Sequence, residues 1–219
     1  MADGGVVVMK PGNAGRAKAP CCSADTQSRK SPIGASLATP PDSVRTLQSV
    51  LQAKAKSEAA YRFYSLWDKV CRADVLYEAW RRCRRNRGTA GVDGQTFRDI
   101  EELGLETWLQ RLRQELRTGQ YRSKPLLRVW IPKASGGQRP LGIPTIRDRV
   151  VQMAMLLILG PIFEEDMFRW QYGFREGVDA KMALRRIHFG IADRGAREVV
   201  DADLSDYFNT IPHGHLMRC

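Results

Sequence analysis

The chain has 219 residues, 43% of them hydrophobic, and its 35 lysines and arginines against 24 aspartates and glutamates leave a net charge of +11. This length holds one medium domain or two small ones, and so large an excess of positive charge favours a polyanionic partner, nucleic acid before an anionic membrane. The longest apolar run, Met153 to Leu159, is far shorter than the ~20 residues of a membrane-spanning helix, so we expect no membrane partner.

The cysteines predict neither a disulfide framework nor a zinc site, because their number, five, is odd and no Cys-x-x-Cys pair occurs. We therefore expect free thiols and a cytoplasmic location. Residues 1–42 are rich in Gly, Ala, Ser, Pro and Lys and lack apolar periodicity, which predicts a disordered leader.

From Ser43 onward the pattern becomes helical. A first amphipathic helix is predicted by apolar residues at three- and four-residue spacing, namely Ala60, Phe63, Tyr64, Trp67, Val70 and Cys71. A second helix is predicted to follow Asp74, a suitable N-cap, and a third is marked by Leu109, Leu112 and Leu116. The tryptophans at helical spacing, Trp67, Trp80 and Trp108, are interpreted as core residues rather than as base-stacking platforms.

The second helix runs into RRCRRNRG, which contains Arg81, Arg82, Arg84, Arg85 and Arg87. Two interpretations stay open. The arginines are either a solvated helix end, where cations suit the helix dipole, or a patch that contacts phosphates. The glycines of GTAGVDG, residues 88–94, predict a loop after this helix.

The second half of the chain mixes strands and helices. Leu127, Val129 and Ile131 alternate with Arg128 and Trp130, which predicts a strand that ends at Pro132. A glycine turn then leads to a return strand with Leu141 and Ile143. A long helix is predicted from Thr145, which fits a capping box with Asp148, and further elements are predicted at 178–192 (helix) and 198–204 (strand). The fold class is therefore α+β.

The stretch VVDADLSDYF places two carboxylates in an apolar strand pattern. Asp201 and Asp203 share one face of the predicted strand, and Val200, Ala202 and Leu204 share the other. A buried carboxylate requires a cation, hydrogen bonds or a solvent-filled cleft. Mg²⁺ satisfies this requirement, and the alternative is an acid at a strand end that caps a neighbouring helix.

The hairpin IPKASGGQRPLGIP places Lys133 and Arg139 on either side of its glycine turn. Lysine offers a compact charge to a phosphate and arginine a planar fork of donors, so this element could hold a triphosphate. The alternative is a solvated hairpin tip, which basic residues often decorate.

Taken together and in this order, four stretches resemble the reverse transcriptases of group II introns, which also serve as maturases. They are GTAGVDGQTF, VWIPKASGGQRPLGIPTIRDRVVQ, QYGFREG and VVDADLSDYF, and the resemblance covers residues 43 to 219. It implies a helical N-terminal extension over residues 43–125, fingers over 126–195 with the hairpin and the long helix, and the first strand of a right-hand polymerase palm within 196–219.

The resemblance also implies roles for individual residues. Asp203 is implied to be the first catalytic aspartate and a ligand of Mg²⁺, with the backbone of Leu204 as a further contact. Lys133, Arg139 and Phe208 are implied to bind the incoming dNTP. The arginines from Arg81 to Arg87 and the loop 88–94 are implied to lie over RNA, so the expected partners are an RNA template, intron RNA, a DNA primer and dNTPs. The implied reaction is nucleotidyl transfer to a primer 3′-hydroxyl, in which metal ions activate the hydroxyl and stabilise pyrophosphate.

The second acidic motif of this family, Tyr-Ala-Asp-Asp, does not occur in the 219 residues. We therefore expect a truncated polymerase that is inactive by itself, with an unpaired palm strand. Two alternatives stay open: a non-catalytic, maturase-like RNA-binding fragment, and a reverse transcriptase of the retron, diversity-generating or phage-defence lineages.

Overall fold

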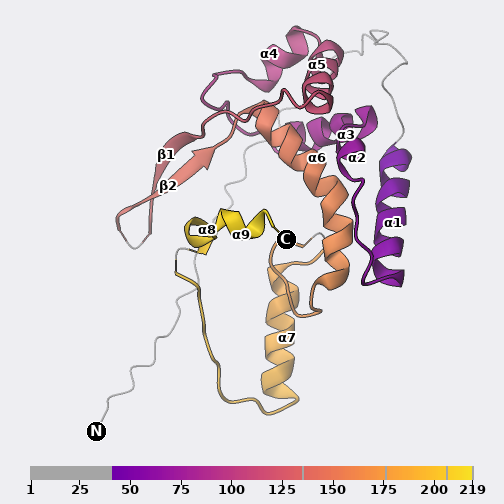
Figure 1. Cartoon of the computed structure of the whole chain (residues 1–219). Helices are drawn as coiled ribbons and strands as arrows, with labels where there is room; N and C mark the ends of the chain where they lie inside the picture. The colour runs from indigo at the N-terminus through magenta and orange to yellow at the C-terminus, as the bar shows by residue number, and fades with distance from the viewer. Residues whose placement is uncertain (1–40, 135, 176, 206, 219) are drawn as a thin grey trace, which may run out of the picture. The chain divides into compact units, whose positions relative to one another are not determined.

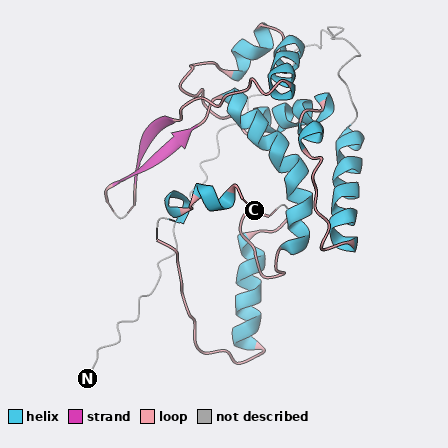
Figure 2. Cartoon of the chain, viewed as in Figure 1, coloured by secondary structure: helices cyan, strands magenta, loops and turns pink. Residues whose placement is uncertain are grey.

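The computed structural model describes residues 41–134, 136–175, 177–205 and 207–218, so the predicted leader lies almost entirely outside the described residues. Within these ranges helices dominate, and one two-stranded antiparallel sheet is present (Figures 1 and 2). This mixture confirms the predicted combination of helices with a small sheet. The elements in chain order are α1 (Pro41–Ser57), α2 (Trp67–Val70), α3 (Ala73–Arg85), α4 (Phe97–Glu102), α5 (Leu105–Arg117), β1 (Leu127–Pro132), β2 (Gln138–Ile143), α6 (Ile146–Phe163), the 3₁₀ helix η1 (Glu164–Asp166), α7 (Ala180–Ala192), α8 (Tyr207–Thr210) and α9 (His213–Leu216).

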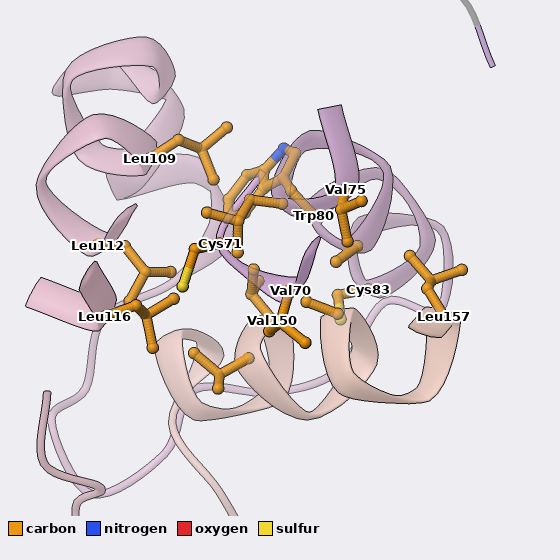
Figure 3. Packing of buried hydrophobic residues seen from close by; sticks show 14 of the residues in the cluster. Val70, Cys71, Val75, Trp80, Cys83, Leu109, Leu112, Leu116, Val150 and Leu157 are labelled. Atoms are coloured by element: carbon orange, nitrogen blue, oxygen red, sulfur yellow. The ribbon is translucent and has the colours of Figure 1, made fainter. Parts of the chain in front are cut away.

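One hydrophobic core joins α3 to α6, with α1, α2 and α5 packed around this pair. Figure 3 shows side chains of these helices pointing toward one another, among them Trp80, Leu112 and Val150. Leu76 on α3 and Ile158 on α6 have no exposed surface. Each buried aliphatic side chain of this size contributes about 1.5–3 kcal/mol of transfer free energy, so the α3–α6 contact is the main stabilising interface of the described residues.

Several predicted helices are confirmed. The Leu109, Leu112 and Leu116 stripe is the buried face of α5, and the long helix predicted from Thr145 is α6, whose buried residues include Val150 and Ile158. The helix predicted at 178–192 is α7, which begins at Ala180.

Asp74 does not cap the second helix as predicted. The N-cap of α3 is Arg72, and Asp74 lies buried in the first turn, where its carboxylate accepts hydrogen bonds from Arg72 Nη2 (2.6 Å) and Ser43 Oγ (2.7 Å). Because Ser43 belongs to α1, this carboxylate joins the two helices. Burial opposes ionisation of Asp74, but the bonds from Arg72 and Ser43 together outweigh it and lower the pKa of the carboxyl group.

The amphipathic helix predicted around residues 60–71 is wrong over most of its length. Residues 58–66 form a turn and an irregular segment, and only Trp67–Val70 are helical. Phe63 of the predicted stripe packs edge to face against its neighbour Tyr61, with ring centroids 5.0 Å apart, and Lys54 of α1 lies over the Tyr61 ring. Tyr64 is 87% exposed. Of the predicted stripe, Val70 and Cys71 are buried in the helical core and Phe63 packs against it, although the residues before Trp67 are not helical.

The strand predicted at 198–204 is also wrong. These residues have no regular secondary structure and are exposed. A strand is held by hydrogen bonds to a neighbouring strand, and within the described ranges no segment pairs with residues 198–204. The alternating pattern alone therefore does not produce a strand here, and the palm strand implied by the resemblance is not formed.

The predicted hairpin is confirmed. β1 and β2 pair antiparallel, with Leu127 opposite Ile143 and Ile131 opposite Arg139. The turn closes through a bond from Lys133 N to Gly137 O (3.0 Å), and Gly136 and Gly137 both have positive φ (86° and 80°), a conformation that favours glycine. Both strands are mostly exposed, so the hairpin is held by its own ladder and by its connections to the helices.

The predicted extension, residues 43–125, and the predicted fingers, residues 126–195, share the core. Residues of α1, α3 and α5 pack in one cluster with residues of α6. The division of the chain at residue 125 stays a prediction. No helix in the described part of the chain has both the length and the apolar character needed to cross a membrane.

Candidate nucleotide and RNA interface

Lys133 and Arg139 lie at the exposed end of the hairpin. Lys133 directly follows β1, and Arg139 is the second residue of β2, opposite Ile131. Neither side chain forms a hydrogen bond or an ion pair with a described residue. Both charges are therefore available to an anion, as the predicted triphosphate contact requires, and the neighbouring glycines leave the turn backbone uncovered.

The base of the hairpin is fixed by a buried carboxylate. Asp148, in the first turn of α6, accepts hydrogen bonds from Tyr121 Oη (2.5 Å), Thr145 Oγ1 (2.6 Å) and the backbone N of Lys124 (3.2 Å). Burial, and then the bond to Asp148, raise the pKa of the Tyr121 phenol. The segment that enters β1 is thereby joined to the helix that follows β2, so both ends of the hairpin are held at one point.

The predicted capping box at Thr145 is half confirmed by this arrangement. Thr145 Oγ1 accepts the hydrogen bond from Asp148 N (3.2 Å), but the Asp148 carboxylate accepts hydrogen bonds from the Thr145 hydroxyl and from the Tyr121 and Lys124 donors described above, not from the backbone N of Thr145.

A complete capping box, which sequence reasoning missed, lies at the start of α4. There Thr96 and Asp99 each bond the backbone N of the other. The Thr-x-x-Asp spacing is the signal that could have indicated it.

The GTAGVDG loop packs against the same helix start. A Cβ atom on Gly91 would lie 2.7 Å from both the N and Cα atoms of Thr145, so only glycine permits this approach. The guanidinium of Arg149 on α6 donates a hydrogen bond to the Thr89 carbonyl, and Lys124 forms an ion pair with Asp93 (3.5 Å). Loop 88–94, the hairpin base and the start of α6 therefore form one connected unit.

The arginine cluster of α3 is only partly available to a ligand. Arg81 and Arg82 both bind the buried carboxylate of Glu78 (2.7 and 3.0 Å), and Arg84 binds Glu101 (2.8 Å). The side chains of Arg85 and Arg87 form no hydrogen bond or ion pair with the residues that the structure describes. The hydrogen bond from Arg81 lowers the pKa of Glu78 against the opposing effect of burial, and Arg82 lowers it further. The sequence contained this signal, because Glu78 precedes Arg81 and Arg82 by three and four residues.

A small polar cavity of about 140 Å³ lies beside this cluster, between α1 and α3. It is lined by Val44, Arg45, Gln48, Glu78, Arg81, Arg82 and Arg85. Four arginines against one glutamate make it an anion-binding environment. Arg45, which sequence reasoning did not single out, contributes from α1 and is brought to the cluster only by the packing of the two helices.

The predicted catalytic aspartate is exposed. Asp203 lies in the irregular segment before α8, and its Oδ1 accepts a hydrogen bond from the backbone N of Leu204 (2.9 Å). The predicted face shared with Asp201 is not formed because the strand is absent. Phe208 lies in α8, exposed, with its ring edge to face against Tyr207 at 5.3 Å. No hydrogen bond or ion pair among the described residues joins this segment to the hairpin, so the roles that the resemblance implies for Asp203 and Phe208 stay predictions.

The described residues offer few ligands for Mg²⁺. A two-ion polymerase site needs several oxygen ligands from carboxylates held close together. Asp203 offers one carboxylate, already bonded to Leu204 N. No group of three or more His, Cys, Asp or Glu side chains in the described ranges could hold a metal ion. These residues therefore do not by themselves fit the metal centre that the resemblance implies.

Comparison with known proteins finds a family match for the C-terminal part of the chain. Residues 131–219 match the sequence model of the family described as reverse transcriptase (RNA-dependent DNA polymerase). Protein YkfC of Escherichia coli (strain K12) is 38% identical over 180 residues, which are 80% of this chain and 47% of YkfC. Group II intron-encoded protein LtrA of Lactococcus lactis subsp. cremoris is 32% identical over 156 residues, 69% of this chain and 25% of LtrA.

A further relative is the putative COX1/OXI3 intron 1 protein of Saccharomyces cerevisiae (strain ATCC 204508 / S288c), 32% identical over 147 residues, which are 66% of this chain and 17% of that protein. The chain thus spans about half the length of YkfC and a quarter or less of the two intron proteins. The matched region contains the hairpin end, α6 and the Asp203 segment. Residues 131–219 therefore carry the reverse transcriptase domain match, and the homologues of the chain include group II intron-encoded proteins.

Proposed function

We propose that this chain supplies the RNA-binding and nucleotide-binding part of an RNA-directed DNA polymerase of the group II intron type. Such an enzyme transfers nucleotides to a DNA primer 3′-hydroxyl on an RNA template, and as a maturase it also binds intron RNA. The observation that carries the proposal is the family match over residues 131–219, which contains the exposed hairpin cations and the Asp203 segment. The intron type is preferred over retron, diversity-generating and phage-defence lineages because the relatives LtrA and the COX1/OXI3 intron 1 protein are intron proteins.

In this proposal residues 43–125 form the extension over RNA, residues 126–195 the fingers and residues 196–219 the start of the palm. Lys133 and Arg139 bind the dNTP triphosphate, Phe208 lies against its sugar, and Asp203 with the Leu204 backbone takes part in the catalytic centre. Support for the triphosphate contact comes from the hairpin, where both cations are exposed and neither has a partner among the described residues. A lysine and an arginine placed together neutralise the charge that develops on a transferring phosphoryl group.

RNA binding is proposed for the arginines at the end of α3. Arg85 and Arg87 carry charges that are not neutralised by described carboxylates, and Arg85 also lines the arginine-rich cavity beside α1. Arg81, Arg82 and Arg84 are oriented by Glu78 and Glu101, so they contribute to the local potential with less conformational freedom. Phosphate neutralisation by such residues releases counterions and makes binding depend on salt.

The test is the salt dependence of RNA binding. Fluorescence anisotropy with a labelled single-stranded RNA should show affinity falling steeply as KCl increases. The double variant Arg85→Gln/Arg87→Gln should reduce the slope of log K against log salt by about 1.4, because each lost phosphate contact removes about 0.7 for a single strand. The matched control is Arg98→Gln, an exposed arginine of α4 paired with Glu102, which should leave the slope unchanged. An unchanged slope in the double variant would refute the assignment.

The second candidate is a non-catalytic RNA-binding module. This candidate is favoured by the small number of Mg²⁺ ligands. The sequence contains no Tyr-Ala-Asp-Asp motif, and the described residues offer one aspartate, Asp203, at the proposed centre. We propose that the 219-residue polypeptide alone binds RNA without extending a primer. Purified chain supplied with a primed RNA template, dNTPs and Mg²⁺ should give no elongated product on a denaturing gel, and clear extension would contradict this part of the proposal.

A further inference from the structure

A second pocket, on a part of the extension that the proposed function does not use, combines an aromatic ring with arginines. It has a volume of about 330 Å³ and lies between α2, the start of α3 and the last turns of α5. It is lined by Trp67, Asp68, Cys71, Arg72, Arg113 and Arg117. The volume is within the range of about 300–1,000 Å³ that small-molecule sites occupy.

Trp67 is held in a fixed position without being buried. Its Nε1 donates a hydrogen bond to the Leu116 carbonyl (3.2 Å), and 49% of its surface stays exposed. This corrects the interpretation of Trp67 as a core residue, which is confirmed for the buried Trp80. The rings of Trp80 and Trp108 lie against each other with centroids 5.4 Å apart, whereas no ring contact is recorded for Trp67 among the described residues. A half-exposed indole fixed at one edge is a preorganised stacking surface.

The arginines of this pocket provide donors beside the ring. Arg113 Nε donates to the Cys71 carbonyl (3.0 Å), which fixes the guanidinium while its terminal nitrogens form no bond with described residues. The side chain of Arg117 has no hydrogen bond or ion pair within the described ranges. Arg72 is committed to Asp74 through two bonds. Arg113 and Arg117 are therefore the two cations available to an anionic ligand.

The one carboxylate of the pocket is already neutralised. Asp68 is bound by Lys69 Nζ (3.1 Å) and by Ser65 Oγ (3.2 Å), and the bond to Lys69 lowers the pKa of its carboxyl group. Three arginines against one paired aspartate leave the pocket electropositive. A ligand that satisfies both the ring and the free guanidinium donors must carry a flat apolar face and an anionic group a short distance apart.

We propose that this pocket binds one nucleotide of single-stranded RNA, with its base stacked on Trp67 and its phosphate paired with Arg113 and Arg117. Aromatic platforms combined with basic grooves are the general means by which proteins hold single strands, and arginine forks match phosphate oxygens. The inference rests on the proposed RNA-binding function and adds to it a site for a base. The net charge of +11 favours a polyanionic strand over an acidic peptide.

The first experiment compares RNA with and without bases. Binding of the 219-residue chain to an oligouridylate and to an abasic oligomer of equal length is measured by anisotropy. We expect the wild type to prefer the oligouridylate and Trp67→Ala to lose at least about fivefold of that preference, since one base–aromatic stack is worth about 1–3 kcal/mol. Trp67→Phe keeps an aromatic ring and should retain most of the preference for the oligouridylate. Tyr64→Ala, which removes an exposed aromatic outside the pocket, is the matched control and should behave as the wild type.

The second experiment separates the phosphate from the base. Arg117→Gln, a change at an exposed side chain, should lower the salt slope by about 0.7 for both oligomers, while Trp67→Phe should leave that slope unchanged. Circular dichroism verifies that each variant is folded, and the Arg117→Gln slope decides the matter if Trp67→Ala does not fold. If Trp67→Ala keeps the full preference for bases, or Arg117→Gln keeps the full slope, the site is refuted. A wild type that binds neither oligomer would instead refute the proposed RNA-binding function itself.

Discussion

Glu78 determines how much of the α3 arginine cluster can act on a ligand. Its buried carboxylate binds Arg81 and Arg82, so two of the arginines that the sequence offers for phosphate contact are partly neutralised inside the protein. A buried carboxylate without these partners would be strongly unfavourable. These two ion pairs therefore stabilise α3, and they leave Arg85 and Arg87 as the cations of the cluster that can bind RNA.

The stability of the fold should depend on pH through Glu78. Since its partners hold the pKa of Glu78 below its ordinary value of 4.5, its contribution is fully present above about pH 4.5 and is lost as pH falls through the lower value of the folded state. Glu78→Gln should cost about 1 kcal/mol of unfolding free energy at pH 7, and the difference from wild type should shrink toward pH 3. Urea unfolding at a series of pH values measures this.

The control for that experiment is Glu102→Gln, which removes the exposed partner of Arg98 in another i,i+4 pair. An exposed ion pair of this kind contributes little to the free energy of unfolding, so Glu102→Gln should have the same stability as the wild type at every pH. A Glu78→Gln difference that stays constant between pH 7 and pH 3 would show that ionisation of Glu78 does not stabilise the fold.

At the scale of elements, the hairpin depends on its base rather than on its faces. Both strands are mostly exposed, and the connection to the helices passes through Asp148, Tyr121 and Thr145. The GTAGVDG loop packs against the same point through Gly91. A change in this loop is therefore expected to affect the placement of Lys133 and Arg139 without touching either residue.

Gly91→Ala tests this junction. The added Cβ would lie 2.7 Å from backbone atoms of Thr145, which cannot yield as a flexible side chain can, so the loop must move away from α6. We expect a loss of about 1–3 kcal/mol in unfolding free energy, typical of an overpacked site, measured by urea unfolding. Gly173→Ala is the matched control, because nothing lies within 4 Å of its added Cβ, and it should stay within about 0.5 kcal/mol of wild type. Equal stability of the two variants would contradict the close approach at Gly91.

At the scale of the whole molecule, the buried residues are concentrated in one part of the chain. The core cluster runs from Val44 to Ile158 and includes helices on both sides of residue 125. By contrast, α7 has no buried residue, and residues 196–205 are exposed. The core thus supports the hairpin and the arginine cluster, while the Asp203 segment is not part of it.

The sequence by itself indicated the reverse transcriptase resemblance, the hairpin and the helices α5 and α6 with their apolar stripes. In α5 and α6 that stripe coincides with the buried face, and the glycine turn of the hairpin requires only local conformational preferences. Such features depend on residues a few positions apart, so they can be recognised without knowing what packs against them. The same reasoning failed at residues 60–66, which are not helical although Phe63 and Leu66 pack against the core, and at residues 198–204, with which no described strand pairs.

Only the tertiary structure decided which charges are free and which aromatic rings are exposed. Arg84 is paired with a glutamate 17 positions away, Asp148 bonds a tyrosine 27 positions away, and Trp67 is fixed by a carbonyl 49 positions away. These contacts join elements that the chain brings together only when it folds. Whether an arginine is paired or available, and whether an indole is core or platform, depends on the surfaces that meet in space, and local sequence patterns do not contain that information.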